Sequence, residues 1–268
     1  GVTPRSLMVE KDHGRNRDGT QELDALLGPK IFNNPKPTKF LNHLLNIAAK
    51  NQDSLVLDFF AGSGSLADAL IQMNVRDQGS RRFILVQLPE PTGRADFPDI
   101  FSITKERVRR AAAKAKAENP MFSGDCGFRV FRLDSSNIQP WNPDSVNLMN
   151  SLLDHAEHVL EGRSNSDLLA ELLLKLGLDL CVPIRSESVA GKQVHFVAGG
   201  VLIACLDERI LTEDVEPLAR IIVECHKELA PAGDTTCVFR DSAFVDDVAK
   251  TNMAAILLQN GIANVRSL

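Results

Sequence analysis

A glycine-containing turn is the segment of this sequence best suited to binding a ligand. Residues 55–60 form an apolar run that predicts a buried strand, and the AGSG sequence at 61–64 leads into a predicted helix from Ser65. Glycines lack a Cβ, so a ligand can approach the backbone closely. The N-terminus of a helix offers N–H groups and partial positive charge to a carboxylate or phosphate, and Asp58 can accept a hydrogen bond from an ammonium or hydroxyl group. A cofactor with a carboxylate, an ammonium group and a ribose, such as S-adenosylmethionine, fits these features.

Two other interpretations of this turn remain open. Gly62, Gly64 and Ala67 also fit the dinucleotide-binding pattern, in which an acidic residue closes the next strand and binds the ribose. The next predicted strand ends in Gln87 instead, with Glu90 beyond a proline, and this weighs against a nicotinamide nucleotide. The third interpretation is a tight turn between a strand and a helix that binds no ligand.

The elements around the turn predict an α/β fold with parallel strands. They are, in order, a helix from Pro37, strands at 55–60 and 83–87 joined by a helix at 65–73, a basic helix at 103–118 and an edge-type strand at 128–133. A strand, helix and strand within about 35 residues form a βαβ unit, whose crossover is right-handed. The two strands of this unit are of the buried type.

A second, smaller α/β domain is predicted for residues 141–268. Its predicted helices span about 145–160, 166–176, 213–229 and 244–260, and its strands span 194–197, 201–206, 236–240 and 264–267. Gly199 and Gly200 separate the first two strands and predict a hairpin. The leucine stripe from Leu168 to Leu176 indicates core or a subunit interface.

The composition is that of a globular protein, and the cysteines indicate a reducing compartment. Apolar residues make up 44% and charged residues 24%, and no apolar run reaches the ~20 residues of a membrane span. The N-terminus has no signal-peptide pattern, so we expect a cytoplasmic protein. The five cysteines include no C-x-x-C pair, which favours reduced thiols. His155 and His158 lie one helical turn apart, but nothing requires a metal, and we predict none.

Six segments of the chain resemble beta-class amino-methyltransferases, most closely the modification subunits of type III restriction–modification systems. They are FNNPKP at 32–37, LDFFAGSGSLADAL at 57–70, GSRRFILVQLPEP at 79–91, ITKERVRRA at 103–111, DLLAELLLKLGLDL at 167–180 and VFRDSAFVDDVAKTN at 238–252. They follow the order of the family through almost the whole chain. The resemblance implies part of a Rossmann-like, S-adenosylmethionine-binding sheet at 31–140, followed by a C-terminal α/β domain that serves assembly.

The resemblance also implies which residues bind the cofactor. They are Phe32, Pro35, Lys36, Pro37, Asp58, Phe59, Phe60, Ala61, Gly62, Ser63, Gly64, Ser65 and Gln87. Ser65 replaces the usual threonine and keeps its hydroxyl, whereas Leu66 and Asp68 replace threonine and histidine. Gln87 stands where many relatives have an acidic ribose ligand.

No catalytic residue is predicted in this chain. In such enzymes the flipped adenine is held by an Asp-Pro-Pro-Tyr motif, and this sequence contains no tyrosine and no Pro-Pro. We therefore expect a C-terminal fragment that is inactive alone, with residues 1–30 the end of a target-recognition region. For the parent protein the resemblance implies adenine-specific methylation of double-stranded DNA, a homodimer and a restriction subunit as partner. The alternatives are an NAD-binding protein and a non-catalytic interaction module.

Two polar clusters could have functional or structural roles. The basic helix could contact DNA phosphates or form a solvated face; its cations are Lys105, Arg107, Arg109, Arg110, Lys114 and Lys116. The cluster from Arg240 to Asn252 is interpreted as a helix cap with an arginine–carboxylate pair rather than a second active centre.

Overall fold

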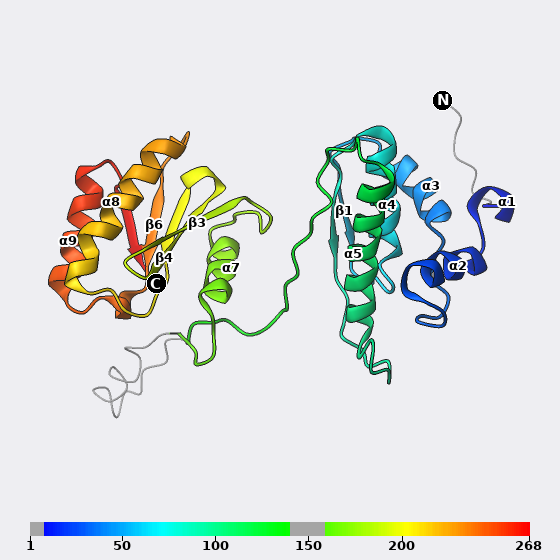
Figure 1. The fold of residues 1–268 in the computed structure, drawn as a ribbon, viewed down its shortest axis with the longest axis horizontal. Helices are drawn as coiled ribbons and strands as arrows, with labels where there is room; N and C mark the ends of the chain where they lie inside the picture. Colours follow the sequence, from blue (N-terminus) through cyan, green and yellow to red (C-terminus); the bar gives the residue numbers. More distant parts are fainter. Residues whose placement is uncertain (1–7, 140–158) are drawn as a thin grey trace. The chain divides into compact units, whose positions relative to one another are not determined.

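The computed structural model describes residues 8–139 and 159–268. The chain forms two compact units, residues 1–128 and 129–268, and each combines helices with strands (Figure 1). The predicted α/β class is therefore confirmed. Each unit is described separately below.

The first unit contains a parallel pair of strands joined by a helix. Strand β1 (Leu55–Asp58) pairs with β2 (Arg82–Leu85), and α4 (Ser65–Asp77) connects them, so the predicted βαβ unit is confirmed. Helices α3 (Thr38–Ala48) and α5 (Ile100–Glu118) both pack against α4. The apolar core lies between these helices and one face of the strands.

Two further helices precede this core. They are α1 (Glu10–His13) and α2 (Asn16–Leu27). Leu23 and Leu27 of α2 are buried in one cluster with Ile31 and with Ile103 of α5. Residues 16–27 therefore belong to the packed core of the first unit, which the weak apolar periodicity before Glu22 did not indicate.

The prediction that both strands of the first unit are buried is wrong. Leu55 and Leu57 are each 54% exposed, and Ile84 and Val86 are each 48% exposed. Within the described residues of this unit the helices cover only one face of β1 and β2 (Figure 1). Parallel strands are usually covered on both faces, so their sequences are apolar on both sides. The residues of β1 and β2 therefore have the apolar pattern of a sheet that is covered on both faces.

The predicted strand at 128–133 is also wrong. Among the described residues this segment pairs with no strand, although its apolar and polar residues alternate. Arg129 attaches this segment to the second unit: its guanidinium donates hydrogen bonds to the carbonyl oxygens of Leu180 (2.6 Å) and Val182 (2.9 Å). Alternation predicts a strand only where a neighbouring strand can accept its backbone hydrogen bonds.

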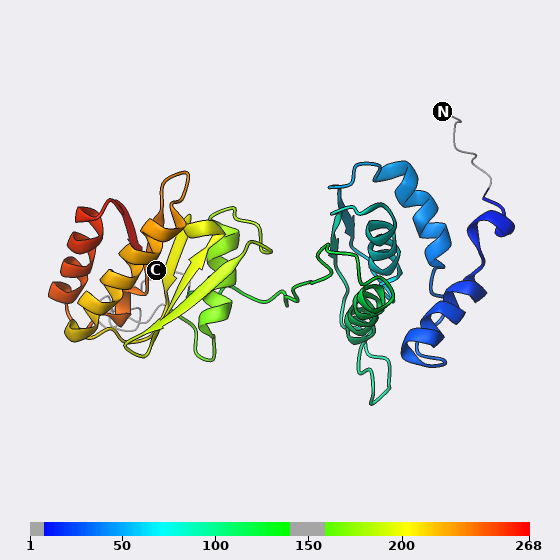
Figure 2. The same ribbon diagram turned by 45° about the horizontal axis from the view of Figure 1, so that its top comes forward.

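The second unit is built on a five-stranded mixed sheet in the order β3-β4-β5-β6-β7. The strands are β3 (Ile184–Val189), β4 (Lys192–Val197), β5 (Leu202–Cys205), β6 (Thr236–Phe239) and β7 (Asn264–Ser267). Strand β4 is antiparallel to both β3 and β5, whereas β5, β6 and β7 are parallel to one another. Helix α7 (Asn165–Lys175) covers one face, and α8 (Thr212–Leu229) and α9 (Asp247–Gln259) cover the other (Figure 2).

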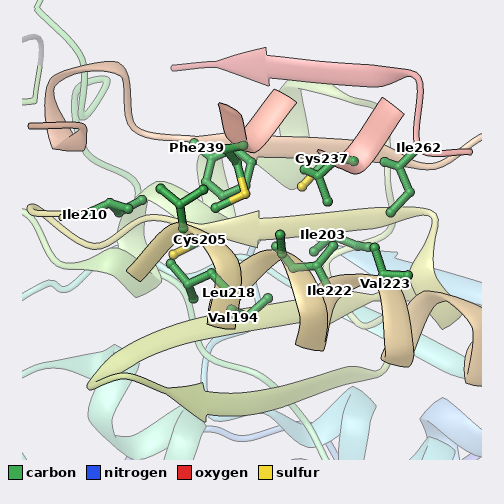
Figure 3. Packing of buried hydrophobic residues seen from close by; sticks show 14 of the residues in the cluster. Val194, Ile203, Cys205, Ile210, Leu218, Ile222, Val223, Cys237, Phe239 and Ile262 are labelled. Atoms are coloured by element: carbon green, nitrogen blue, oxygen red, sulfur yellow. The ribbon is translucent and has the colours of Figure 1, made fainter. Parts of the chain in front are cut away.

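Alternate residues of the central strands build a core on each face of this sheet. Ile203, Cys205, Cys237 and Phe239 pack with α8 and α9 (Figure 3), whereas the opposite face packs with the α7 leucines Leu168, Leu169, Leu172 and Leu173. The leucine stripe is therefore core up to residue 173. Burial raises the pKa of the Cys205 thiol to about 12 and raises the pKa of Cys237 as well. Both thiols stay protonated and act as small apolar groups.

The predicted hairpin in this unit is confirmed, with β4 and β5 separated by a 3₁₀ turn (η1, Ala198–Gly200). A second hairpin, β3 to β4, was not predicted because β3 carries charged and polar residues (IRSESV). Its turn consists of Ala190 (φ 50°) and Gly191 (φ 75°), the two positive angles that a tight hairpin requires. The predicted helix at 145–160 falls almost wholly outside the described residues.

Glu171 on α7 binds residues 136 and 137, which precede α7 in the second unit. Its carboxylate accepts hydrogen bonds from Ser136 Oγ (2.6 Å), from Asn137 N and Nδ2 (both 2.7 Å) and from Lys175 Nζ (2.9 Å). Burial raises the pKa of this carboxyl, but the hydrogen bonds outweigh burial and lower the pKa from 4.5 to about 2.

Replacing Glu171 with glutamine is expected to destabilise the second unit in a pH-dependent way. Because the pKa is lower in the folded state, the stabilisation by Glu171 is complete above pH 4.5 and disappears as the pH falls toward 2. Denaturant unfolding across this range should show the wild type and Glu171→Gln converging at the acid end. Glu161 is exposed, so the free energy of unfolding of the control Glu161→Gln should follow that of the wild type across this pH range. A difference between Glu171→Gln and the wild type that does not change with pH would contradict the assignment.

Candidate functional site

The turn at 61–64 has the left-handed backbone that its glycines permit. Gly62 has φ 54° and Gly64 has φ 77°. A Cβ on Gly64 would lie 3.2 Å from the carbonyl oxygen of Thr104 and 3.3 Å from its Cγ2. Helix α5 therefore packs directly against the inner side of the turn, and a side chain at this position would separate them.

Helix α4 begins at this turn with its first-turn N–H groups pointing out of the helix end. Gly64 is the N-cap and has no side chain that could accept a hydrogen bond from these N–H groups. Uncapped N–H groups of a 13-residue helix carry partial positive charge and suit an anionic group. Beside them, the Asp58 carboxylate accepts a hydrogen bond from the N–H of Phe60 (3.0 Å), which fixes its direction at the end of β1.

Gln87, which follows β2, makes a hydrogen bond to the turn. Its Oε1 accepts a hydrogen bond from the N–H of Gly62 (2.7 Å), and its Nε2 donates to the carbonyl oxygen of Leu88 (3.0 Å). Sequence reasoning placed Gln87 at the ribose position and did not foresee this contact with the turn. The two residues are 25 positions apart, and no local pattern signals the bond.

Gln87→Leu is expected to loosen the turn. Loss of the acceptor leaves the Gly62 N–H without its partner, which costs about 1–3 kcal/mol and should speed amide exchange at Gly62 by about tenfold or more. The control Gln87→Glu keeps an acceptor oxygen and should retain the protection. Equal exchange at Gly62 in the wild type and Gln87→Leu would show that the bond contributes nothing.

The segment at 32–37 reaches the turn through one residue. The ring of Phe32 lies beside Gly62, with Cζ 3.5 Å from where a Cβ on Gly62 would stand. Pro35 and Pro37 are buried, and Pro37 is the N-cap of α3. Lys36 is exposed. Of the predicted site residues in this segment, the structure thus brings Phe32 to the turn, whereas Pro35 is buried and Pro37 begins α3.

Phe59 and Phe60 lie on the open side of the turn. Their rings meet edge to face with centroids 5.5 Å apart, and they are 60% and 81% exposed. The two exposed aromatic rings form an apolar surface beside the N-terminus of α4. A flat apolar group can stack there.

The basic helix α5 has an inward-facing cation that sequence reasoning assigned to a possible DNA surface. Arg107 is fully buried, so its assignment as a DNA-contact candidate is wrong. Arg109 and Arg110 are exposed and both donate to Glu106, and hydrogen bonding by Arg109 is the main cause that lowers the pKa of Glu106 to about 2. Contact of the exposed cations with DNA stays a prediction.

The polar cluster of the second unit makes the structural contacts that were predicted for it. Asp246 caps α9 by accepting a hydrogen bond from the N–H of Ala249 (2.7 Å). Arg240 lies 3.6 Å from Glu208, and Lys250 pairs with Asp241. These contacts confirm the cap and the arginine–carboxylate pair.

The structure brings no metal ligands together among residues 8–139 and 159–268. All five cysteines are free thiols. Cys225 is buried and His226 Nε2 lies 3.0 Å from Thr235 Oγ1, whereas His155 and His158 are outside the described residues. No described helix is long and apolar enough to span a membrane.

Comparisons with known proteins place the turn within a family. A family model described as DNA methylase matches residues 8–90, which include α2, the 32–37 segment, the turn and Gln87. The chain is 29% identical over 244 residues to the Mod subunit of the type III restriction–modification enzyme EcoPI of Escherichia phage P1, covering 85% of this chain and 37% of that protein. It is 30% identical over 228 residues to the EcoP15I Mod subunit of Escherichia coli, covering 82% and 33%.

A third relative matches a shorter part of the chain more closely. The StyLTI Mod subunit of Salmonella typhimurium is 38% identical over 130 residues, covering 46% of this chain and 20% of that protein. The chain thus spans between a fifth and little more than a third of the length of these relatives.

Proposed function

Since this chain belongs to the family of modification subunits of type III restriction–modification enzymes, we propose that its first unit binds S-adenosylmethionine at the 61–65 turn. The observation that carries the proposal is the uncapped N-terminus of α4, which follows the left-handed glycines directly. The parent protein is then an adenine-specific DNA methyltransferase.

The residues around the turn suit the parts of this cofactor. The N–H groups at the start of α4 would receive its carboxylate, and the Asp58 carboxylate would receive the ammonium group. Phe32 and the exposed rings of Phe59 and Phe60 offer apolar contacts to the adenosine part. Bound in this way, the cofactor would present an electrophilic methyl group, and the turn would orient it without reacting with it.

We infer that the groups that bind the target adenine belong to another part of the parent protein. The sequence contains no tyrosine and no Pro-Pro, so it offers no Asp-Pro-Pro-Tyr motif to hold the adenine amine. The exposed apolar face formed by Leu55, Leu57, Ile84 and Val86 supports this division, because it needs a second layer of structure. We infer that this layer completes a Rossmann-like sheet and brings the catalytic motif to the cofactor.

The second unit has a different role in this proposal. Its polar clusters are occupied by caps and ion pairs, so we infer that it serves assembly. The partners we propose for the parent protein are double-stranded DNA, a second copy of the modification subunit and a restriction subunit.

Calorimetric titration of the chain with S-adenosylmethionine, S-adenosylhomocysteine and NAD tests the proposed ligand. The first two share the carboxylate and ammonium group and should bind, whereas NAD should not. Binding of NAD alone would replace the proposal with a dinucleotide site, and binding of none would leave an interaction module. The chain alone should transfer no methyl group to duplex DNA; measurable transfer would show that the active site lies within it.

A further inference from the structure

A single buried cation lies behind the turn. Arg107 of α5 has 0% exposure and is the largest fully buried side chain among the described residues. A buried guanidinium must be compensated by charge and hydrogen bonds, because its transfer from water is costly. Its contacts therefore indicate which parts of the unit it holds together.

The first set of contacts leads to the turn. Nη1 of Arg107 donates to Ser63 Oγ (3.1 Å) and to Ser65 Oγ (2.7 Å), and these two hydroxyls lie 3.1 Å apart. Nε and Nη2 donate to the same Oδ2 of Asp68 (3.1 and 3.0 Å), one turn further along α4. The guanidinium thus holds the inner side of the turn and the first turn of α4 in one arrangement.

The second set of contacts leads to the 32–37 segment. Nη2 of Arg107 lies 3.8 Å from Glu22 Oε2 on α2. The same carboxylate accepts hydrogen bonds from the N–H of Thr38 (2.9 Å) and from its hydroxyl (3.0 Å), and so caps α3 immediately after Pro37. One side chain therefore connects, through Glu22, both segments that are assigned to the cofactor.

We propose that Arg107 is a positioning residue, which sets the geometry of the cofactor turn relative to the 32–37 segment and Thr38 without touching the cofactor. This inference rests on the proposed function. Binding groups keep their geometry when the residues behind them are locked by packing and hydrogen bonds. Asp68 has its own part in the arrangement, because it supplies the carboxylate that a buried arginine needs.

Arg107→Lys tests the inference in the full chain, with Arg81→Lys as the matched control. Arg81 is also buried in the first unit, but it contacts the far ends of α3 and α4. We expect Arg107→Lys to weaken S-adenosylmethionine binding by about tenfold or more, as outer supporting residues do. Arg81→Lys should change the affinity by less than about twofold, as an independent site does. Thermal unfolding of both variants shows that each is folded at the titration temperature.

Amide hydrogen exchange without ligand provides the second readout. Arg107→Lys should accelerate exchange in two separate segments, 60–66 and 32–38, whereas Arg81→Lys should leave both unchanged. A folded Arg107→Lys with unaltered affinity and unaltered exchange in these segments would overturn the inference. If the wild type binds no S-adenosylmethionine, the proposed function fails, and the exchange pattern alone then decides whether Arg107 couples the two segments.

Discussion

Replacing Gly19 with alanine is expected to destabilise the first unit by about 3 kcal/mol. Gly19 lies inside α2, where alanine would normally stabilise a helix by up to about 1 kcal/mol. Here a Cβ would collide with the backbone of the 32–37 segment: with the carbonyl oxygen of Pro35, and at 2.8 Å with Lys36 C and with Pro37 N. Backbone atoms cannot rotate away as a side chain can, so the segment must move.

Calorimetric unfolding of Gly19→Ala measures this loss, and Gly233→Ala is the control. A Cβ on Gly233 meets nothing within 4 Å among the described residues. Gly233→Ala should leave the stability within about 0.5 kcal/mol of the wild type. A stabilised Gly19→Ala would mean that α2 does not lie against Pro35–Pro37. In the expected case, exchange of the amides around Phe32 should also accelerate.

Replacing Arg81 with methionine is expected to cost about 3–5 kcal/mol, the typical effect of removing one partner from a buried ionic network. The guanidinium, whose residue is 4% exposed, donates to the carbonyl oxygen of Ala49 (2.9 Å), to Asn74 Oδ1 (3.4 Å) and to Asp77 Oδ1 (3.0 Å). It therefore supplies a hydrogen-bond donor to a carbonyl oxygen at the end of α3 and joins this end to the last turn of α4. The hydrogen bond from Arg81 is the main cause of the lowered pKa of Asp77.

Arg76→Met is the matched control for this prediction. Arg76 is exposed near the end of α4, and among the described residues its side chain donates to Asn42 Oδ1 (3.1 Å). Its replacement should cost less than about 1 kcal/mol. Amide exchange in α3 and α4 reports both variants within the first unit. Equal effects of the two replacements would contradict the role assigned to Arg81.

Local patterns predicted the elements of the fold well. Apolar patterns predicted helices α3, α4, α5, α7, α8 and α9 and strands β1, β2 and β4 to β7, because these elements carry apolar residues on at least one side. β3 was missed because its polar, solvated side chains give no apolar signal. The strand at 128–133 was predicted wrongly because alternation describes a side-chain pattern and not the presence of a pairing neighbour.

The contacts of the candidate site depend on residues that are distant in the sequence. The glycine turn was visible because it joins a strand to a helix within a few residues. The bonds that fix it join Gln87 to Gly62 and Arg107 to Ser65, across separations of 25 and 42 positions. Arg107 looked like a surface cation because its neighbours on α5 are basic; only tertiary packing shows that it points inward.

The most direct test of the account is the response of the turn's own amides to the cofactor. Amide resonances of Gly62, Ser63, Gly64 and Ser65 should shift in a saturable manner when S-adenosylmethionine is added, because its carboxylate would bind beside them, at the first N–H groups of α4. Gly199 and Gly200 of the second unit should not shift. Saturating cofactor that leaves these four resonances unmoved, or that moves only residues elsewhere, would contradict the assignment of the 61–65 turn as the cofactor site.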